Sequence, residues 1–270
     1  MDFNKYRITP EQQIKLQELE TNVDDGFSDK ELAKLRRDLW SDLADYQERL
    51  YAESKQSLLI VLQAMDAAGK DSTIAKLTSN LNVQGCKVHS FKSPTKKELS
   101  HDFLWRIHQC VPAAGEIALF NRSHYEDVLI VKVHDWAAPN TIAARYEHIN
   151  NFESLLADRG TKVLKFMLNI SPEYQLERFK RRLKYKEKNW KFNPRDLVER
   201  TLWDEYMQAF EIALNTCSTE QSPWYVVPAE NRRYRDVMIA SVILERLKEM
   251  NPQFPEPDFD TAKFTVDSIQ

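Results

Sequence analysis

The segment that most constrains the fold is residues 57–73, in which a continuous apolar run leads into a short loop of small residues. Residues 58–63 (L-L-I-V-L-Q) are nearly all leucine or β-branched, as is typical of a strand buried on both faces of a sheet. Gly69, Lys70 and a helical pattern follow. Strand, small-residue loop, glycine-lysine and helix is the order of a phosphate-binding P-loop, whose backbone N–H groups and positive helix end face the phosphates.

The match to the pattern G-x-x-x-x-G-K-[ST] is incomplete, because Ala64 replaces the first glycine and Asp71 follows the lysine. The alternative is an ordinary strand-to-helix turn. Asp66 favours a phosphate site: a carboxylate inside the loop would repel phosphate unless a divalent cation lay between them. We therefore expect Asp66 to be a magnesium ligand or a base near the transferred group. The candidate residues of this segment are Asp66, Ala67, Ala68, Gly69, Lys70, Asp71 and Ser72.

Composition excludes several classes of protein. The chain has 42% hydrophobic and 29% charged residues, enough for a core and for a soluble surface. Its net charge of −3 argues against a general affinity for nucleic acid. The three cysteines are scattered and form no C-x-x-C pair, which fits a reducing cytoplasm. No apolar run is long enough to cross a membrane, and the first residues do not resemble a signal peptide.

The spacing of apolar residues along the chain divides it into an N-terminal arm (1–26), a single domain (27–250) and a C-terminal tail (251–270). A capping box at Ser28 and Glu31 begins an amphipathic helix that ends near residue 54 and can pack on the sheet or on another subunit. We also expect the protein to be a homo-oligomer.

Five apolar stretches alternate with helical patterns along the domain. We expect strands at residues 58–63, 87–91, 117–120, 161–170 and 224–228, and one helix over 98–110. This alternation predicts an α/β fold of three layers, α/β/α, with a central parallel sheet. Ligands of such sheets bind beyond the carboxyl ends of the strands, so the loops after the first three strands should meet at one edge.

Two of these loops carry further candidates. Lys92 follows the second strand, and Asn121, Arg122 and Glu126 follow the third. Arginine can bind a phosphate through two hydrogen bonds, and a carboxylate such as Glu126 can hold metal or orient an acceptor. The alternative is that these residues form a helix N-cap at the surface and contact only solvent. Asp102 and Arg106, early in the expected helix 98–110, are candidate ligand contacts.

A basic segment follows the fourth strand. Residues 178–191 hold eight Lys or Arg residues and one glutamate, a local charge of +7. Arg178, Arg181 and Arg182 have the spacing of one helix face, where like charges repel unless an anion is bound. The alternative is a solvated charge run. In a P-loop protein this pattern predicts a helical basic lid, at about residues 178–200, that closes over phosphates and excludes water.

Three motifs in order resemble the polyphosphate kinase 2 family. They are M-D-A-A-G-K-D-S-T at residues 65–73, S-F-K-S-P-T…E-L-S-H-D-F-L-W-R at residues 90–106, and F-N-R-S-H-Y-E at residues 120–126. The resemblance extends over roughly residues 51–250. Many members have F-D-R-S-W-Y-N at the third motif, and the version with Asn121 and Glu126 resembles the subgroup that uses both nucleoside mono- and diphosphates.

The resemblance implies a P-loop kinase-like fold and reversible phosphoryl transfer between inorganic polyphosphate and adenine or guanine nucleotides, with Mg²⁺ or Mn²⁺. By the family's pattern, Asp66, Gly69, Lys70 and Arg122 lie at the phosphates, with Arg178 and Arg182 on the lid. Two alternatives stay open: an ATP-dependent nucleoside monophosphate kinase, and a non-catalytic polyanion-binding protein, which Asp71 in place of serine or threonine would favour.

Overall fold

A six-stranded sheet forms the centre of the molecule, as seen in the computed structural model, which describes residues 3–261 and 263–264. The strand order is β1-β6-β5-β2-β4-β3. The strands are β1 (Arg7–Ile8), β2 (Ser57–Gln63), β3 (Cys86–Ser90), β4 (Ile117–Asn121), β5 (Thr161–Asn169) and β6 (Trp224–Pro228). Strands β2 to β6 are parallel, and β1 adds an antiparallel edge to β6. The predicted central parallel sheet is confirmed.

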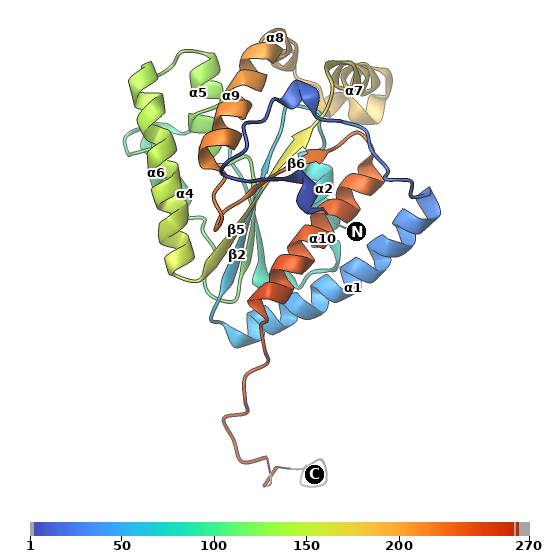
Figure 1. Cartoon of the computed structure of the whole chain (residues 1–270), viewed down its shortest axis with the longest axis vertical. Coiled ribbons are helices and arrows are strands. Elements are labelled where there is room, and N and C mark those ends of the chain that lie inside the picture. Colours follow the sequence, from blue (N-terminus) through green and yellow to red (C-terminus); the bar gives the residue numbers. More distant parts are fainter. Residues whose placement is uncertain (1–2, 262, 265–270) are drawn as a thin grey trace.

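Helices cover both faces of the sheet, which confirms the predicted three layers (Figure 1). Helices α1, α2 and α10 lie on one face, and α6 and α9 lie on the other. The helices are α1 (Asp29–Glu53), α2 (Lys70–Leu77), α3 (Lys96–Leu99), α4 (Trp105–His108), α5 (Ile130–Val133), α6 (Pro139–Asp158), α7 (Pro172–Lys184), α8 (Arg195–Thr201), α9 (Trp203–Cys217) and α10 (Arg232–Met250).

Strand β2 is buried along its whole length and is paired with β4 on one side and β5 on the other. Its alternate side chains enter different cores. Leu58, Ile60 and Leu62 belong to the apolar cluster beneath α1 and α10, whereas Leu59 and Val61 belong to the cluster beneath α6 and α9. Two-sided burial explains why this strand is a continuous apolar run rather than an alternation.

The helix predicted from the Ser28 capping box is α1. Ser28 Oγ accepts a hydrogen bond from the Glu31 amide at 3.3 Å, and the Glu31 carboxylate accepts one from the Ser28 amide at 2.9 Å. Leu32, Trp40 and Leu50 are buried in the core of the same chain, where α1 packs along α10 (Figure 1). This face of α1 is therefore used within the chain.

The single helix expected over residues 98–110 is wrong. The chain forms two short helices there, α3 and α4, with a turn between them. In that turn Asp102 Oδ1 accepts a hydrogen bond from the Leu104 amide at 2.9 Å. Short polar side chains compete in this way with the helical hydrogen bonds of the backbone, and the periodicity of apolar residues does not report it.

The N-terminal arm takes part in the sheet and in the core. It contributes β1 to the sheet and buries Phe3, Ile8 and Leu16. Ser218 Oγ donates a hydrogen bond to the Ile8 carbonyl at 2.5 Å, which joins β1 to the loop before β6.

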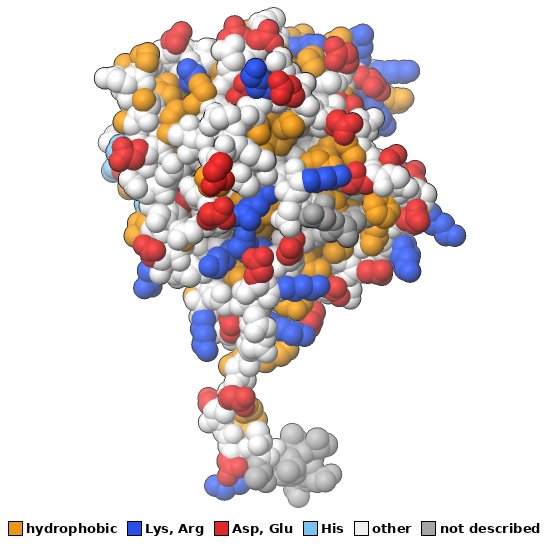
Figure 2. Space-filling view, viewed as in Figure 1, with side chains coloured by type: hydrophobic (Ala, Val, Ile, Leu, Met, Phe, Trp, Pro, Cys, Tyr) orange, Lys and Arg blue, Asp and Glu red, His pale blue; other side chains and the backbone are white. Residues whose placement is uncertain are grey.

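The surface seen in Figure 2 mixes acidic and basic side chains. None of the described helices combines the length and apolarity that crossing a bilayer requires.

A buried ion pair supports the turn after β4. Lys165 on β5 and Glu153 on α6 are at most 2% exposed, and their Nζ and Oε2 atoms lie 2.5 Å apart. Lys165 also donates to the Tyr125 hydroxyl at 3.0 Å, and that hydroxyl donates to Glu153 Oε1 at 2.9 Å. Burial alone would raise the pKa of Glu153, but the charge of Lys165 lowers it below its ordinary value. The turn that carries Arg122 is thus anchored to two other elements.

Replacing Lys165 with Met should destabilise the protein by about 3–5 kcal/mol, because the Glu153 carboxylate would be left buried without its cation. The free energy of unfolding in urea measures this loss. The double variant Lys165→Met/Glu153→Gln should lose less than Lys165→Met alone, since no unpaired charge remains. A double variant that is as unstable as Lys165→Met would contradict this account of the pair.

Candidate active site

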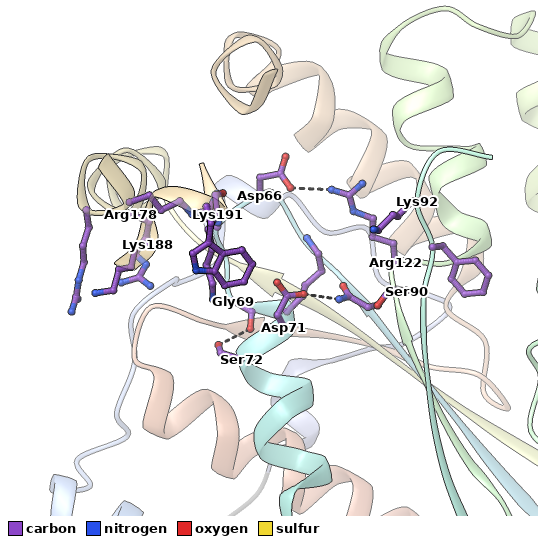
Figure 3. Close-up of a pocket in the computed structure, with 17 residues that line it drawn as sticks. Asp66, Gly69, Asp71, Ser72, Ser90, Lys92, Arg122, Arg178, Lys188 and Lys191 are labelled. Atoms are coloured by element: carbon purple, nitrogen blue, oxygen red, sulfur yellow. Dashed lines mark hydrogen bonds and ion pairs between the residues drawn. The ribbon is translucent and has the colours of Figure 1, made fainter. Parts of the chain in front are cut away.

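A cleft of about 610 Å³ lies at the carboxyl ends of β2, β3 and β4, beside α7 (Figure 3). The loop after β2 lies between cations of the α7 region on one side and Arg122 and Lys92 on the other. The cleft is lined by Asp66, Ala67, Gly69, Lys70, Asp71, Ser72, Ser90, Phe91, Lys92, Asn121, Arg122, Arg178, Arg181, Arg182, Lys188, Trp190 and Lys191. The expected meeting of three loops at one edge of the sheet is therefore present.

The loop between β2 and α2 (residues 64–69, hereafter the phosphate loop) has an unusual backbone. Ala67 and Gly69 have φ angles of 68° and 110°, and Gly69 is the N-cap of α2. The first amides of a helix have no intrahelical acceptor, so those of α2 are available to an anion. The loop thus has the geometry expected of a P-loop despite the missing first glycine.

Arg235 on α10 contacts this loop and was not among the predicted site residues. Its guanidinium is fully buried and donates to Asp236 Oδ1 at 2.9 and 2.7 Å, and to the Ala68 carbonyl at 3.4 Å. A Cβ atom at Gly69 would lie 2.4 Å from Arg235 Nη1. Gly69 is therefore required by its φ angle and by this close approach. The sequence signal was weak, because Arg235 and Asp236 follow two further arginines and precede the largely apolar residues 237–244.

Lys70 lies on the floor of the cleft and is only 8% exposed. Its ammonium donates to the carbonyls of Ala64 at 2.8 Å and Met65 at 3.4 Å. Burial lowers the pKa of Lys70, while the charge of Asp66 opposes that shift. Among the described residues its hydrogen-bond acceptors are thus neutral carbonyls, and a phosphate oxygen would be a stronger partner.

Arg122 joins the loop after β4 to the phosphate loop. Its Nη2 lies 3.1 Å from Asp66 Oδ1, and its backbone has a φ of 63°, a conformation that costs a non-glycine residue energy. Burial alone would lower the pKa of Arg122, but the charges of Glu126 and Asp66 raise it. A second link joins Asn121 Nδ2 to Asp71 Oδ1 at 2.6 Å. The end of β4 and the turn after it are therefore linked both to the phosphate loop and to the first turn of α2.

The basic segment consists of α7 and the turn that follows it, and Arg178, Arg181 and Arg182 all line the cleft as their spacing predicted. Arg182 already has a partner, since its Nη1 lies 3.0 Å from Asp196 Oδ2. Burial, and then the neighbouring charge of Arg232, lower the pKa of Arg178. Crowded cations with few carboxylates form a surface suited to a polyanion.

Four predicted site residues do not line the cleft. Ala68 belongs to the phosphate loop, but its side chain is buried in the core. Asp102 caps the turn between α3 and α4. Arg106 is nearly buried and donates to the Lys92 carbonyl at 2.9 Å, so it supports the loop after β3. Glu126 is half-buried, and its Oε1 is 3.0 Å from the Gln63 amide nitrogen in the orientation that satisfies both ends of that amide. Direct ligand contacts of these residues stay predictions.

The cleft also contains residues that were not predicted as site residues. Ser90 and Phe91 come from the end of β3 and the residue after it, and Lys188, Trp190 and Lys191 come from the turn after α7. Trp190 is 79% exposed, so it belongs to the cleft wall and not to the core. The basic composition of the segment indicated the lysines, whereas a lone serine or phenylalanine after a strand gives no signal by itself.

Comparison with known proteins identifies the family. The model of the polyphosphate kinase 2 (PPK2) family matches residues 26–255. The chain belongs to this family. It is 43% identical over 98% of its length to the AMP/ADP-polyphosphate phosphotransferase of Meiothermus ruber, all of which is covered. It is 41% identical over 93% of its length to the ADP-polyphosphate phosphotransferase of Rhodopseudomonas palustris, of which 92% is covered.

A solved structure of this family has the same fold. The crystal structure of polyphosphate kinase 2 from Arthrobacter aurescens is 39% identical to the chain, with a TM-score of 0.85. The match covers 93% of this chain and 95% of that one. The family resemblance drawn from the three sequence motifs is therefore confirmed.

Replacing Gly69 with Ala should damage the phosphate loop more than its φ angle alone explains, because the new Cβ would meet Arg235. Gly26 is the matched control: its φ is 77° and a Cβ there has no neighbour within 4 Å. Gly26→Ala should cost about 1–2 kcal/mol of unfolding free energy, the backbone term alone. Gly69→Ala should lose more, and its affinity for tripolyphosphate, measured by calorimetry, should fall. Equal losses in both variants would contradict the role of Arg235.

Proposed function

We propose that the protein transfers phosphoryl groups reversibly between inorganic polyphosphate and adenine or guanine nucleotides, converting AMP to ADP and ADP to ATP with magnesium. The observation that carries this proposal is one cleft in which a phosphate loop faces the cations of α7. The family, and the names of relatives that act on AMP or ADP and polyphosphate, support the same reaction.

The chain's own residues perform three tasks in this proposal. The amides at the start of α2 and the Lys70 ammonium hold the phosphoryl group that moves, with Lys70 exchanging its carbonyl acceptors for a phosphate oxygen. Arg122 binds a neighbouring phosphate, and Asp66 fixes its guanidinium at 3.1 Å. Arg178 and Arg181 close over the donor chain and exclude water. Such a reaction depends on positioning and on stabilising the charge of the transition state.

Magnesium fits the residues of the cleft. Asp66 and Asp71 are two carboxylates in a lining that is otherwise neutral or cationic. Magnesium is usually held by one or two carboxylates together with substrate phosphates. Among the described residues no group of three acidic, histidine or cysteine side chains forms a ready metal cage, which agrees with that mode. When bound, Mg²⁺ or Mn²⁺ would neutralise phosphate charge between Asp66 and the transferred group, and Glu126 is the second predicted ligand.

The alternatives differ in the donor. An ATP-dependent nucleoside monophosphate kinase needs a base pocket on the donor side, whereas a polyphosphate donor needs only cations along its path. The basic wall formed by Arg178, Arg181, Lys188 and Lys191 favours the second. A non-catalytic scaffold would retain the cations but has no need of Lys70. We further propose a cytoplasmic protein that assembles into a homo-oligomer and binds neither nucleic acid nor membrane.

The deciding experiment supplies purified protein with magnesium and AMP or ADP, and offers either polyphosphate or ATP as donor. We expect ADP and then ATP to form from AMP with polyphosphate. Phosphorylation of AMP from ATP alone, with none from polyphosphate, would establish the kinase alternative, and no transfer from either donor would establish the scaffold.

The metal role of Asp66 is tested by Asp66→Asn, which keeps the size of the side chain and removes the charge that holds a hard cation. Turnover with polyphosphate and ADP should fall by about 100-fold or more, and excess magnesium should restore it at most in part. The measurement is the rate as a function of magnesium concentration. An unchanged rate and an unchanged magnesium dependence would remove Asp66 from the mechanism.

The lid is tested by Arg178→Glu/Arg181→Glu. Both residues line the cleft, and among the described residues neither has a carboxylate partner such as Arg182 has. Binding of long polyphosphate should weaken by at least about tenfold and lose much of its salt dependence, since fewer counterions are released. Binding of ADP should change less. Lys180→Glu/Lys184→Glu, on the same helix but outside the cleft lining, is the matched control. Equal losses of polyphosphate affinity in both double variants would show that the effect comes from net charge alone.

Acceptor choice is tested by Glu126→Asn. Glu126 lies beside Gln63 and raises the pKa of Arg122, so it can adjust where an acceptor phosphate rests without lining the cleft. The ratio of kcat/KM for AMP to that for ADP should fall in the variant, and this ratio separates acceptor selection from general damage. A ratio that does not move would mean that Glu126 does not select the acceptor.

A further inference from the structure

A second, smaller basic cleft lies between α1 and the end of α2. It measures about 260 Å³ and is lined by Arg36, Arg37, Trp40, Lys76, Ser79 and Asn80. It shares no lining residue with the active-site cleft. Three of the six side chains are cationic and none is acidic, so the lining has the composition of an anion site.

Asp38 directly follows the two arginines, but no carboxylate occupies the positions on their helix that face them. Positions three and four residues before and after Arg36 and Arg37 are Leu32, Ala33, Lys34, Leu39, Trp40 and Ser41. Neighbours on a helix surface are found at those spacings. Among the described residues neither arginine forms an ion pair, whereas Arg49 on the same helix pairs with Asp45. In the described part of the chain Arg36 and Arg37 are thus two adjacent cations without an ion-pair partner.

Lys76 connects this cleft to the phosphate loop. Its ammonium pairs with Asp236, whose carboxylate is 1% exposed and also binds Arg235. Arg235 in turn reaches Ala68 and lies under Gly69. One carboxylate, that of Asp236, is therefore shared by the two cations Lys76 and Arg235. Together with Arg36 and Arg37, these residues make four cations and one anion, a net charge of +3.

The remaining lining residues suit a phosphate. The Trp40 indole N–H is satisfied by the Lys76 carbonyl at 2.7 Å, so its ring forms a fixed wall. Ser79 and Asn80 are exposed polar side chains at the rim. Arginine binds tetrahedral oxyanions through paired donors, and lysine adds a point charge. Condensed phosphate concentrates negative charge in a volume that such a cleft can hold.

We propose that this cleft is a second, non-catalytic binding site for condensed phosphate, such as a short oligophosphate or the end of a polyphosphate chain. The choice of ligand rests on the proposed function, but the site does not take part in the transfer. Binding there would place an anion on Lys76, one ion pair away from the residues that support the phosphate loop.

The test is the number of tripolyphosphate molecules bound per chain, measured by calorimetry at low ionic strength in the absence of nucleotide. The parent should bind two. Arg36→Gln/Arg37→Gln should bind one, and so should Ser79→Phe, which fills the cleft without changing its charge. Lys30→Gln/Lys34→Gln removes the same charge from the same helix at positions outside the cleft lining and should still bind two. Thermal unfolding checks that each variant is folded.

The proposal is overturned if the parent binds only one tripolyphosphate, or if Arg36→Gln/Arg37→Gln binds as many as the parent with the same affinity. Orthophosphate and a single-stranded oligonucleotide are the comparison probes. Loss of oligonucleotide binding in the arginine variant, with tripolyphosphate binding retained, would assign the cleft to nucleic acid instead. No step measures turnover, so a failure here is distinct from a failure of the proposed reaction.

Discussion

The two-sided burial of β2 is the constraint on which the rest of the site depends. Five apolar side chains of this strand enter two separate cores, so the strand cannot move to the edge of the sheet without exposing apolar surface. The phosphate loop begins where β2 ends, and its position is therefore fixed by the core. Strands β4 and β5, paired on either side, carry the Arg122 turn and the ion pair that anchors it.

Ion pairs and hydrogen bonds connect the loops that the sheet brings together at one edge. The Asp66–Arg122 contact joins the loops after β2 and β4, and the Asn121–Asp71 contact joins the end of β4 to the first turn of α2. Arg235 on α10 also contacts the phosphate loop. Each of these loops contains a residue in a left-handed backbone conformation, Ala67 in one and Arg122 in the other. Such conformations persist only where the surroundings determine them, and they are frequent at ligand sites.

Much of the fold could be predicted from the sequence because its signals are local. The apolar runs of β2 and β5 and the capping box at Ser28 each indicate their own element. The helix expected over residues 98–110 failed because Asp102 bonds to the backbone of its own turn, which periodicity does not detect. The edge strand β1 is only two residues long, too short for any pattern.

Site residues that directly follow a strand or share one helix face could be predicted. A residue that supports the site from a distant part of the sequence could not. Lys70, Arg122 and the α7 arginines were found from motif order and helix spacing. Arg235 was missed because its contact with the phosphate loop joins residues more than 160 positions apart. Glu126 and Arg106 lie in the right region, but the side chain of Gln63 and the carbonyl of Lys92 hold them outside the cleft lining.

The central claim is that the cleft holds the phosphoryl group that is transferred, with Lys70 at that group. The most direct measurement is the single-turnover rate of transfer from polyphosphate to ADP in Lys70→Ala, with Lys34→Ala as a surface control. We predict a fall of at least about 100-fold in Lys70→Ala, no change in the control, and little change in thermal unfolding for either. A folded Lys70→Ala protein that transfers phosphate at the parent's rate would contradict the account.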